Sequence, residues 1–251
     1  MKAQAIFDAI NRAADFSTAM DFDNPGFLVG DPQEEVRGVL CALDVTDGVI
    51  DEAVARGANV IVTHHPIIFH PLKRVTADTL VWRCIRAGLS VICAHTNLDA
   101  AAGGVNDILC GKLDLREVCL PQGGEGMLRA GTLDRGMAPA EFAYYVKQKL
   151  DLPALRYSDG GRPIQRVAVC GGAGGSFLQA ALADGCQALV TGDVKHDVFL
   201  EALHRGITLV DAGHFGTEQH VVPYLAQLAA QGAGEAPVAI ARSNTDPSTT
   251  I

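Results

Sequence analysis

The sequence predicts an α/β protein built from two related halves. Apolar runs typical of buried strands alternate with segments of helical periodicity over residues 36–99, and the same order of elements recurs over residues 166–218. The composition supports a folded protein with a sizeable core, because 48% of the 251 residues are hydrophobic and 20% are charged. Each half is therefore expected to form a three-layer unit, in which helices cover both faces of a mainly parallel sheet.

The first half opens with an amphipathic helix over residues 2–14, since Ile6, Phe7 and Ile10 fall on one helical face. A turn-rich loop around a short apolar run follows at residues 23–32. Strands and helices then alternate in this order: a strand at 36–45, a helix at 46–57, a strand at 59–66, a helix at 76–87 and a strand at 88–99.

The second half repeats this order at low identity. A shift of 128 residues places residues 166–193 over residues 38–65 and aligns Gly185 with Gly57, and the third strands correspond at a shift near 119. Five matching elements in one order indicate two related α/β halves. The predicted domains are residues 1–120 and residues 121–251, the second with a helix near 139–150.

Charge and hydropathy exclude several classes of protein. The chain carries a net charge of −9 and has no basic run, so a nucleic-acid partner is not expected. No apolar stretch reaches the ~18 residues of a transmembrane helix. Residues 1–16 mix charged with apolar side chains, unlike the apolar core of a signal peptide. We therefore expect a cytoplasmic protein with no membrane partner.

The cysteines are predicted to be reduced core residues. Their number is odd, none belongs to a C-x-x-C pair, and most lie inside apolar runs. These features argue against disulfides and against a thiolate zinc site. The seven are Cys41, Cys84, Cys93, Cys110, Cys119, Cys170 and Cys186.

Metal-capable side chains follow the predicted strands in four places. The carboxyl ends of parallel strands share one edge of a sheet, so we expect these motifs to converge there. Each motif alone is weak evidence for a metal site, because a chance pair in a loop, a polar loop or a helix cap explains it. Together they supply enough imidazoles and carboxylates for two metal ions, with water completing the coordination. The motifs are His64-His65, His95-x-x-x-Asp99, Gly192-Asp193 and His214-x-x-x-Glu218.

The donor types narrow the choice of metal. Nitrogen and oxygen donors without thiolate suit Zn²⁺, Mn²⁺, Fe²⁺, Co²⁺ and Ni²⁺, among which the sequence does not distinguish. Asp193 is placed to orient a ligand histidine, and Lys195 and His196 are candidates for binding substrate. The glycine-rich segment 170–176 fits either a phosphate cradle at a helix start or a plain tight turn.

Five sequence blocks resemble the signature blocks of the NIF-three-like family, whose members are labelled GTP cyclohydrolase 1 type 2 homologues. The blocks extend from residue 23 to residue 218, so the resemblance covers most of the chain. The first block has Phe22 before D-N where the family often has Trp, an exchange of one aromatic residue for another. The blocks are DNPGFLVGDP (23–32), VTHHPIIF (62–69), HTNLD (95–99), TGDVKH (191–196) and DAGHFGTE (211–218).

The resemblance implies a compact two-domain protomer with a dinuclear metal centre in the cleft between its halves. It also implies a ring-shaped homohexamer, a trimer of dimers. One carboxylate, that of Glu218 or of Asp99, is expected to bridge two divalent ions, and His95 is expected beside the ions as a weak ligand or as a supporting residue. The implied ligands are His64, His65, Asp99, His214 and Glu218.

Two functions remain open at this level. The first is a metal-dependent hydrolase acting on a small, nucleotide-like substrate, with a bridging water ionised by the two ions. The second is a non-catalytic metal-binding or regulatory scaffold. The family label does not fix the reaction, since fold and site do not determine a substrate, and the sequence identifies no general acid or base.

Overall fold

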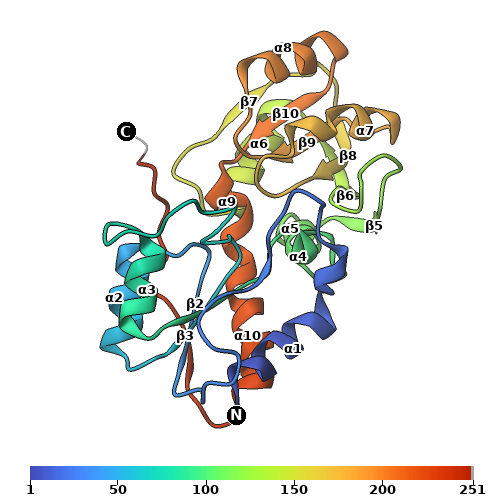
Figure 1. Cartoon of the computed structure of the whole chain (residues 1–251). Helices are drawn as coiled ribbons and strands as arrows, with labels where there is room; N and C mark the ends of the chain where they lie inside the picture. The colour runs from blue at the N-terminus through green and yellow to red at the C-terminus, as the bar shows by residue number, and fades with distance from the viewer. Residues whose placement is uncertain (250–251) are drawn as a thin grey trace. The chain divides into compact units, whose positions relative to one another are not determined.

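The computed structural model describes residues 1–249, which form two compact units. The first unit comprises Met1–Ala102 and Val221–Thr245, and the second comprises residues 103–220 and 246–249. Each unit is thus built from two stretches of chain rather than from one continuous half. Both are α/β, which confirms the predicted class, and the elements of each can be followed in Figure 1.

The first unit contains a five-stranded sheet in the order β1-β4-β3-β2-β11. Strand β1 is antiparallel to β4, and the other neighbours are parallel. The strands are β1 (Gly26–Val29), β2 (Val39–Ala42), β3 (Val60–Thr63), β4 (Ser90–Cys93) and β11 (Val238–Ile240). The helices are α1 (Ala3–Ala13), η1 (Phe16–Thr18), α2 (Asp47–Ala55), α3 (Leu80–Ala87), α4 (Thr96–Ala100) and α10 (Val222–Ala233).

Helices cover both faces of this sheet, with α2 and α3 on one side and α1 and α10 on the other (Figure 1). Every residue of β2, β3 and β4 is buried, as expected for parallel strands covered on two faces. Helix α10 lies near the C-terminal end of the chain but belongs to the first unit, where it packs closely on α1. A Cβ on Gly232 would lie 2.3 Å from the carbonyl oxygen of Ala5, so only glycine permits this approach.

The second unit contains a six-stranded sheet in the order β5-β6-β8-β9-β10-β7. Only its central strands β8, β9 and β10 are mutually parallel, and β5, β6 and β7 pair antiparallel with their neighbours. The strands are β5 (Arg116–Cys119), β6 (Arg129–Met137), β7 (Arg156–Ser158), β8 (Ile164–Val169), β9 (Ala188–Thr191) and β10 (Thr208–Asp211). The helices are α5 (Val105–Lys112), α6 (Pro139–Lys149), η2 (Gly174–Phe177), α7 (Leu178–Ala183), α8 (His196–Arg205) and α9 (His214–Glu218), with η3 (Gln219–Val221) following.

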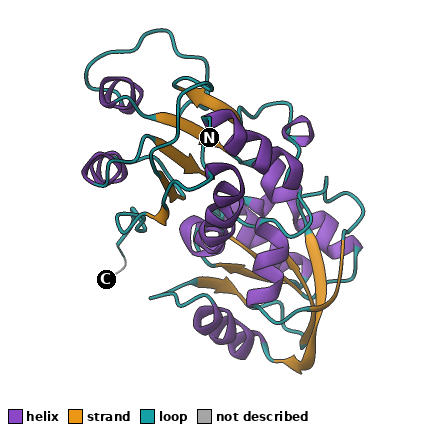
Figure 2. Cartoon of the chain, turned by 90° about the horizontal axis from the view of Figure 1, so that it is seen from below, coloured by secondary structure: helices purple, strands orange, loops and turns teal. Residues whose placement is uncertain are grey.

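Helices also pack on both faces of this sheet. Figure 2 shows the helices and strands of the chain from a second direction. Leu109 of α5 and Phe142 of α6 share one apolar cluster with Val167 and Val190 of the sheet. Leu178 of α7 and Ala202 of α8 belong to the cluster on the opposite face. The three-layer prediction is therefore confirmed for this unit.

The predicted internal repeat is present in the topology. The series β2-α2-β3-α3-β4 in one unit matches β8-α7-β9-α8-β10 in the other, and the preceding strands β1 and β7 pair antiparallel with the last strand of each series. A short helix, α4 or α9, follows each series. His95 and Asp99 thus occupy the same place in one unit that His214 and Glu218 occupy in the other.

The cysteine prediction is correct for six residues and wrong for one. All seven thiols are free, and all are buried except Cys119. Cys119 ends the edge strand β5, whose residues are all exposed, and its Sγ lies 3.2 Å from Nη2 of Arg166. Burial raises the pKa of the Cys41 thiol to about 12, which keeps it protonated and unreactive.

Glu52 of α2 holds the C-terminal segment of the first unit. Its carboxylate accepts hydrogen bonds from the backbone N–H groups of Arg242 and Ser243, at 3.1 and 3.0 Å, and from the Ser243 hydroxyl at 2.8 Å. Burial raises the pKa of Glu52, but these bonds and one from Arg56 outweigh it and lower the pKa to about 2.

We expect Glu52→Gln to lower the free energy of unfolding at neutral pH and to lose this effect in acid. Because the folded-state pKa of about 2 lies below the ordinary value of 4.5, the carboxylate stabilises the fold above pH 4.5 and less as the pH falls toward 2. Urea denaturation of wild type and variant at a series of pH values measures the difference. Glu34→Gln, which removes a carboxylate paired with Arg37, is the control. If the difference in unfolding free energy between wild type and Glu52→Gln stays the same in acid, the Glu52 carboxylate does not stabilise the fold in this way.

Candidate functional site

His64 and His65 directly follow β3, at the carboxyl edge of the first sheet. His64 is fully buried, and its Nδ1 lies 2.8 Å from the carbonyl oxygen of Ala94, the residue after β4. His65 is partly exposed, and its Nδ1 lies 2.7 Å from Oδ1 of Asp44, which follows β2. The acceptor for each ring therefore comes from the end of a neighbouring strand.

His95 lies beyond the end of β4, and Asp23 holds it. The Nδ1 of His95 is 2.7 Å from Oδ1 of Asp23. The other carboxylate oxygen accepts hydrogen bonds from the backbone N–H of Thr96 at 3.0 Å and from the Thr96 hydroxyl at 2.6 Å. Burial raises the pKa of Asp23, but the bonds from His95 and Thr96 outweigh it and bring the pKa to about 2, so the group is a carboxylate.

The three imidazoles form one cluster. Their ring centroids are 5.0 Å apart for His64 and His65, 5.3 Å for His64 and His95, and 5.6 Å for His65 and His95. One ring nitrogen from each lies within 4.8 Å of the others, close enough to hold a single metal ion. Because each Nδ1 faces an outer oxygen, Nε2 is the nitrogen for a metal, as in most histidine metal sites. The structure places His95 in this cluster as fully as the other two.

Asp99 adds a carboxylate beside the imidazole cluster. It lies on α4 and is 5% exposed, and its Oδ1 is 3.4 Å from Nε2 of His64. A buried carboxylate next to a buried imidazole is a donor set suited to a divalent cation, since the cation would neutralise charge that is otherwise costly to bury. The predicted ligands His64, His65 and Asp99 are thus gathered within the first unit.

The second unit holds its own histidine and carboxylates. His214 begins α9, and its Nε2 lies 3.1 Å from Oε2 of Glu218, one helical turn later. Its Nδ1 lies 2.7 Å from Oδ2 of Asp193, the contact that an orienting role for Asp193 requires. Hydrogen bonding to Glu218, followed by its charge and by Asp193, outweighs burial and raises the pKa of His214 to about 9. Asp193 adopts a left-handed backbone with φ 52°.

The glycine-rich segment packs against His214 and Glu218 as a tight turn. The N–H groups of Gly171, Gly172 and Gly174 already donate to the side chains of Asn106, Thr217 and Thr191. A Cβ on Gly172 would lie 2.4 Å from Oε1 of Glu218. The glycines therefore serve to let the loop approach Glu218, which favours the tight-turn interpretation of the sequence.

The sequence analysis did not identify the two carboxylates that orient the imidazole cluster, Asp44 and Asp23. Asp44 could have been found, because it lies just beyond the end of a buried strand, as the four motifs do. Asp23 carried a weaker signal, since it belongs to the DNPG turn of the first signature block. The substrate candidates Lys195 and His196 lie at the start of α8 and are exposed, two and three residues beyond Asp193.

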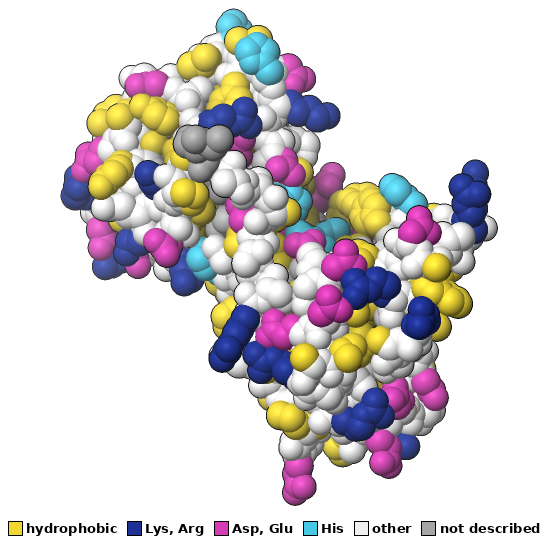
Figure 3. Space-filling model, turned by 90° about the vertical axis from the view of Figure 1, so that its left-hand side faces the viewer, with side chains coloured by type: hydrophobic (Ala, Val, Ile, Leu, Met, Phe, Trp, Pro, Cys, Tyr) yellow, Lys and Arg dark blue, Asp and Glu magenta, His cyan; other side chains and the backbone are white. Residues whose placement is uncertain are grey.

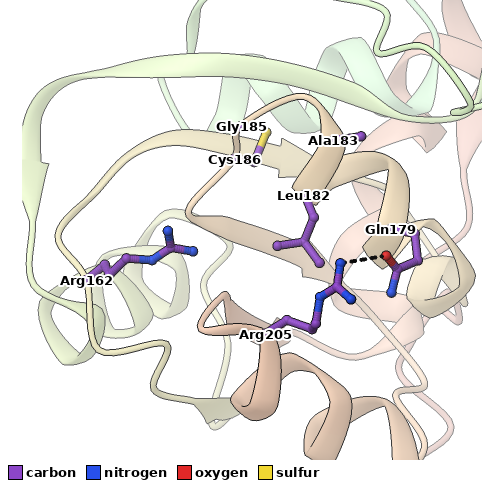
Figure 4. A pocket seen from close by; sticks show the side chains of 7 residues that line it. All are labelled: Arg162, Gln179, Leu182, Ala183, Gly185, Cys186 and Arg205. Carbon is purple, nitrogen blue, oxygen red and sulfur yellow. Dashed lines mark hydrogen bonds between the residues drawn. The ribbon is translucent and has the colours of Figure 1, made fainter.

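Two cavities lie at opposite ends of the second sheet. One of about 330 Å³ is bordered by Asp193, Gly213 and Arg156, so it opens beside His214. The other, of about 390 Å³, is bordered by Arg162 and Arg205 and lies where β8, β9 and β10 begin (Figure 4). In it Arg205 donates to Oε1 of Gln179 at 3.3 Å. Only the first cavity lies beside the candidate metal donors.

Comparisons with known proteins agree with these observations. A family model described as Duf34/NIF3 (NGG1p interacting factor 3) matches residues 1–247. A Clostridium acetobutylicum protein named GTP cyclohydrolase 1 type 2 homolog is 32% identical over 98% of this chain and 98% of its own length. A Nostoc protein of the same name is 37% identical over 78% of this chain and 76% of its own length. The crystal structure of a hypothetical protein from Staphylococcus aureus has a TM-score of 0.91 at 28% identity, covering 100% of this chain and 99% of that one.

Proposed function

The chain belongs to the Duf34/NIF3 family, and from that premise we propose that it binds two divalent metal ions and hydrolyses a small, nucleotide-like substrate. The observation that carries the proposal is the cluster of His64, His65 and His95. All three Nδ1 atoms are engaged by outer oxygens, so the rings are held in the tautomer and orientation that a metal requires.

We propose the ligand set that the family resemblance implies, namely His64, His65, Asp99, His214 and Glu218, with His95 as a further ligand. The first unit supports it through the contact of His64 with Asp99, and the second through the contact of His214 with Glu218. When bound, divalent ions supply a Lewis acid and a water ionised at neutral pH, with a pKa lowered to about 7. The nitrogen and oxygen donors are compatible with Zn, Mn, Fe, Co or Ni.

The side chains around the ligands keep the site ordered. Asp44 and Asp23 each accept from the Nδ1 of an imidazole in the first unit, and Asp193 does so in the second. Such carboxylates fix the ring and increase its basicity toward a metal. The cavity bordered by Asp193 and Gly213 has room for part of a substrate, and the exposed Lys195 and His196 nearby along the chain are proposed to meet its anionic groups.

A nucleotide-like substrate is proposed because relatives of this chain carry the name GTP cyclohydrolase 1 type 2 homolog. A metal-binding scaffold without catalysis is the second candidate. It is favoured by the fact that Asp23, Asp44 and Asp193 are each engaged by a histidine, which leaves no evident general acid among the carboxylates of the described site. Metal-dependent turnover in a panel of nucleotides, esters and cyclic amides would separate the two.

The metal proposal is tested by the metal content of protein purified without added metal or chelator. We expect about two equivalents per chain in the wild type and a large loss in the variant His64→Ala/Asp99→Ala. His204→Ala, which removes an exposed histidine of α8, is the matched control and should keep the wild-type content. Circular dichroism shows whether each variant is folded. A wild type without metal, or a folded double variant with full content, would refute the proposal.

We further propose that the protein is cytoplasmic and assembles into a homohexamer, a trimer of dimers. No helix within residues 1–249 is long and apolar enough to cross a membrane. On the face shown in Figure 3, Lys and Arg side chains are interspersed with Asp and Glu, which favours a small-molecule substrate over nucleic acid. Light scattering tests the assembly, with a mass six times that of the chain expected and a monomer or dimer contradicting it.

A further inference from the structure

Two phenylalanines stand exposed beside the imidazole cluster of the first unit. Phe22 immediately precedes Asp23 and is 63% exposed, and Phe69 ends the VTHHPIIF block and is 37% exposed. Their ring centroids are 6.4 Å apart at an interplanar angle of 57°. Apolar and aromatic side chains commonly line the sites where proteins bind small ligands, so two neighbouring exposed rings beside candidate metal donors are a candidate binding surface.

Both phenylalanines lie next to residues that form or hold the imidazole cluster. The ring of Phe69 lies 6.1 Å from the ring of His95, at an angle of 83°. The residue after Phe22 is the Asp23 that holds His95. A ligand that covered the two phenylalanines would therefore lie next to the imidazole cluster.

The loops that carry the two rings are fixed to each other. The side-chain amide of Asn24 donates to the carbonyl oxygen of Ile68 at 2.7 Å. This bond joins the residue two beyond Phe22 to the residue just before Phe69. The rings are thus presented on a connected support, and little conformational entropy is lost when a ligand binds.

We propose that Phe22 and Phe69 form an aromatic platform that binds the planar ring of the substrate beside the metal donors. This inference rests on the proposed function, which it extends by assigning the substrate class as one with a flat heteroaromatic ring. Stacking on a phenylalanine requires a π face and no particular hydrogen-bonding edge, so the platform favours planar rings in general. Discrimination between one planar ring and another must then come from polar groups elsewhere in the site.

The test measures binding of GTP, ATP and tripolyphosphate to the protein as purified, by titration calorimetry. Phe69→Leu and Phe22→Leu keep an apolar side chain but remove the π face. We expect each to weaken binding of both nucleotides about tenfold, with tripolyphosphate binding and metal content unchanged. Leu72→Ala is the control, because Leu72 is an apolar residue three positions after Phe69 and is 50% exposed. This variant should bind nucleotides as the wild type does.

The outcomes separate this inference from the metal proposal. Wild-type nucleotide affinity in both leucine variants, or no nucleotide binding by the wild type, would overturn the platform whatever the metal content. Weakened nucleotide binding in the variants would support it even if the wild type held no metal. If the variants instead lower the mass of the assembly and leave nucleotide affinity unchanged, the rings are a subunit contact and the inference fails.

Discussion

Replacing Gly172 with alanine is expected to weaken metal binding by about tenfold or more while the protein stays folded. Gly172 has φ +60°, and a Cβ there would lie 2.4 Å from Oε1 of Glu218 and 3.1 Å from Nε2 of His214. The end of a glutamate side chain can move, so the collision displaces the donor atoms more than it disrupts the sheet. Metal affinity, measured by competition with a chelator, should therefore fall further than the free energy of unfolding.

Gly185→Ala is the matched control for this substitution. Gly185 has φ +75°, and nothing lies within 4 Å of the position of its Cβ. It shares the backbone strain of Gly172, about 1 kcal/mol or more for alanine, but has no collision with a side chain. We expect it to lower stability and to leave metal affinity unchanged. Equal metal affinity in the two variants would show that the approach of the loop to Glu218 is unimportant.

Replacing Asp23 with alanine is expected to reduce both stability and metal affinity. The carboxylate is fully buried and accepts four hydrogen bonds, from His95, from the backbone N–H of Asn24, and from the backbone and hydroxyl of Thr96. Its loss leaves these donors without their acceptor and costs about 2–3 kcal/mol of unfolding free energy. It also releases the ring of His95, which should weaken metal binding by about 10–100-fold.

Chemical denaturation and chelator competition measure the two effects of Asp23→Ala separately. Asp21→Ala, two residues away and exposed, is the control and should change neither quantity by much. Asp23→Asn keeps an oxygen for His95 but loses the charge, so an intermediate result is expected. Full metal affinity in Asp23→Ala would contradict the proposal that this carboxylate orients His95 for metal binding.

The sequence predicted those features that depend on local periodicity. Runs such as residues 60–63 and 188–191 are continuously apolar up to a threonine, and they are buried strands in the structure. The helices between these strands were predicted from the helical spacing of their apolar residues. The strand-end motifs, and with them His64, His65, His95 and His214, were recognised because a functional side chain at the end of a buried strand is visible in the sequence itself.

The sequence could not predict which carboxylate holds which imidazole. Asp23 and His95 are 72 residues apart in the chain, and Asp44 and His65 are 21 apart. Their contacts depend on strand order, which is set by how whole layers pack. Asp23 reaches His95 because β1 runs antiparallel to β4, with Gly26 opposite Cys93. Asp44 reaches His65 because β2 lies parallel to β3, with Ala42 opposite Thr63.

Composition, periodicity and motif spacing by themselves determined an acidic α/β chain with two related halves and a set of candidate donors at strand ends. The resemblance of five sequence blocks to those of a known family indicated the family. Only the tertiary structure showed that α10 completes the first unit, that His95 lies in one cluster with His64 and His65, and that the glycine-rich loop packs on Glu218. The physical reason is that local sequence governs which segments become strands and helices. Contacts between distant segments depend on close packing, which a linear pattern does not encode.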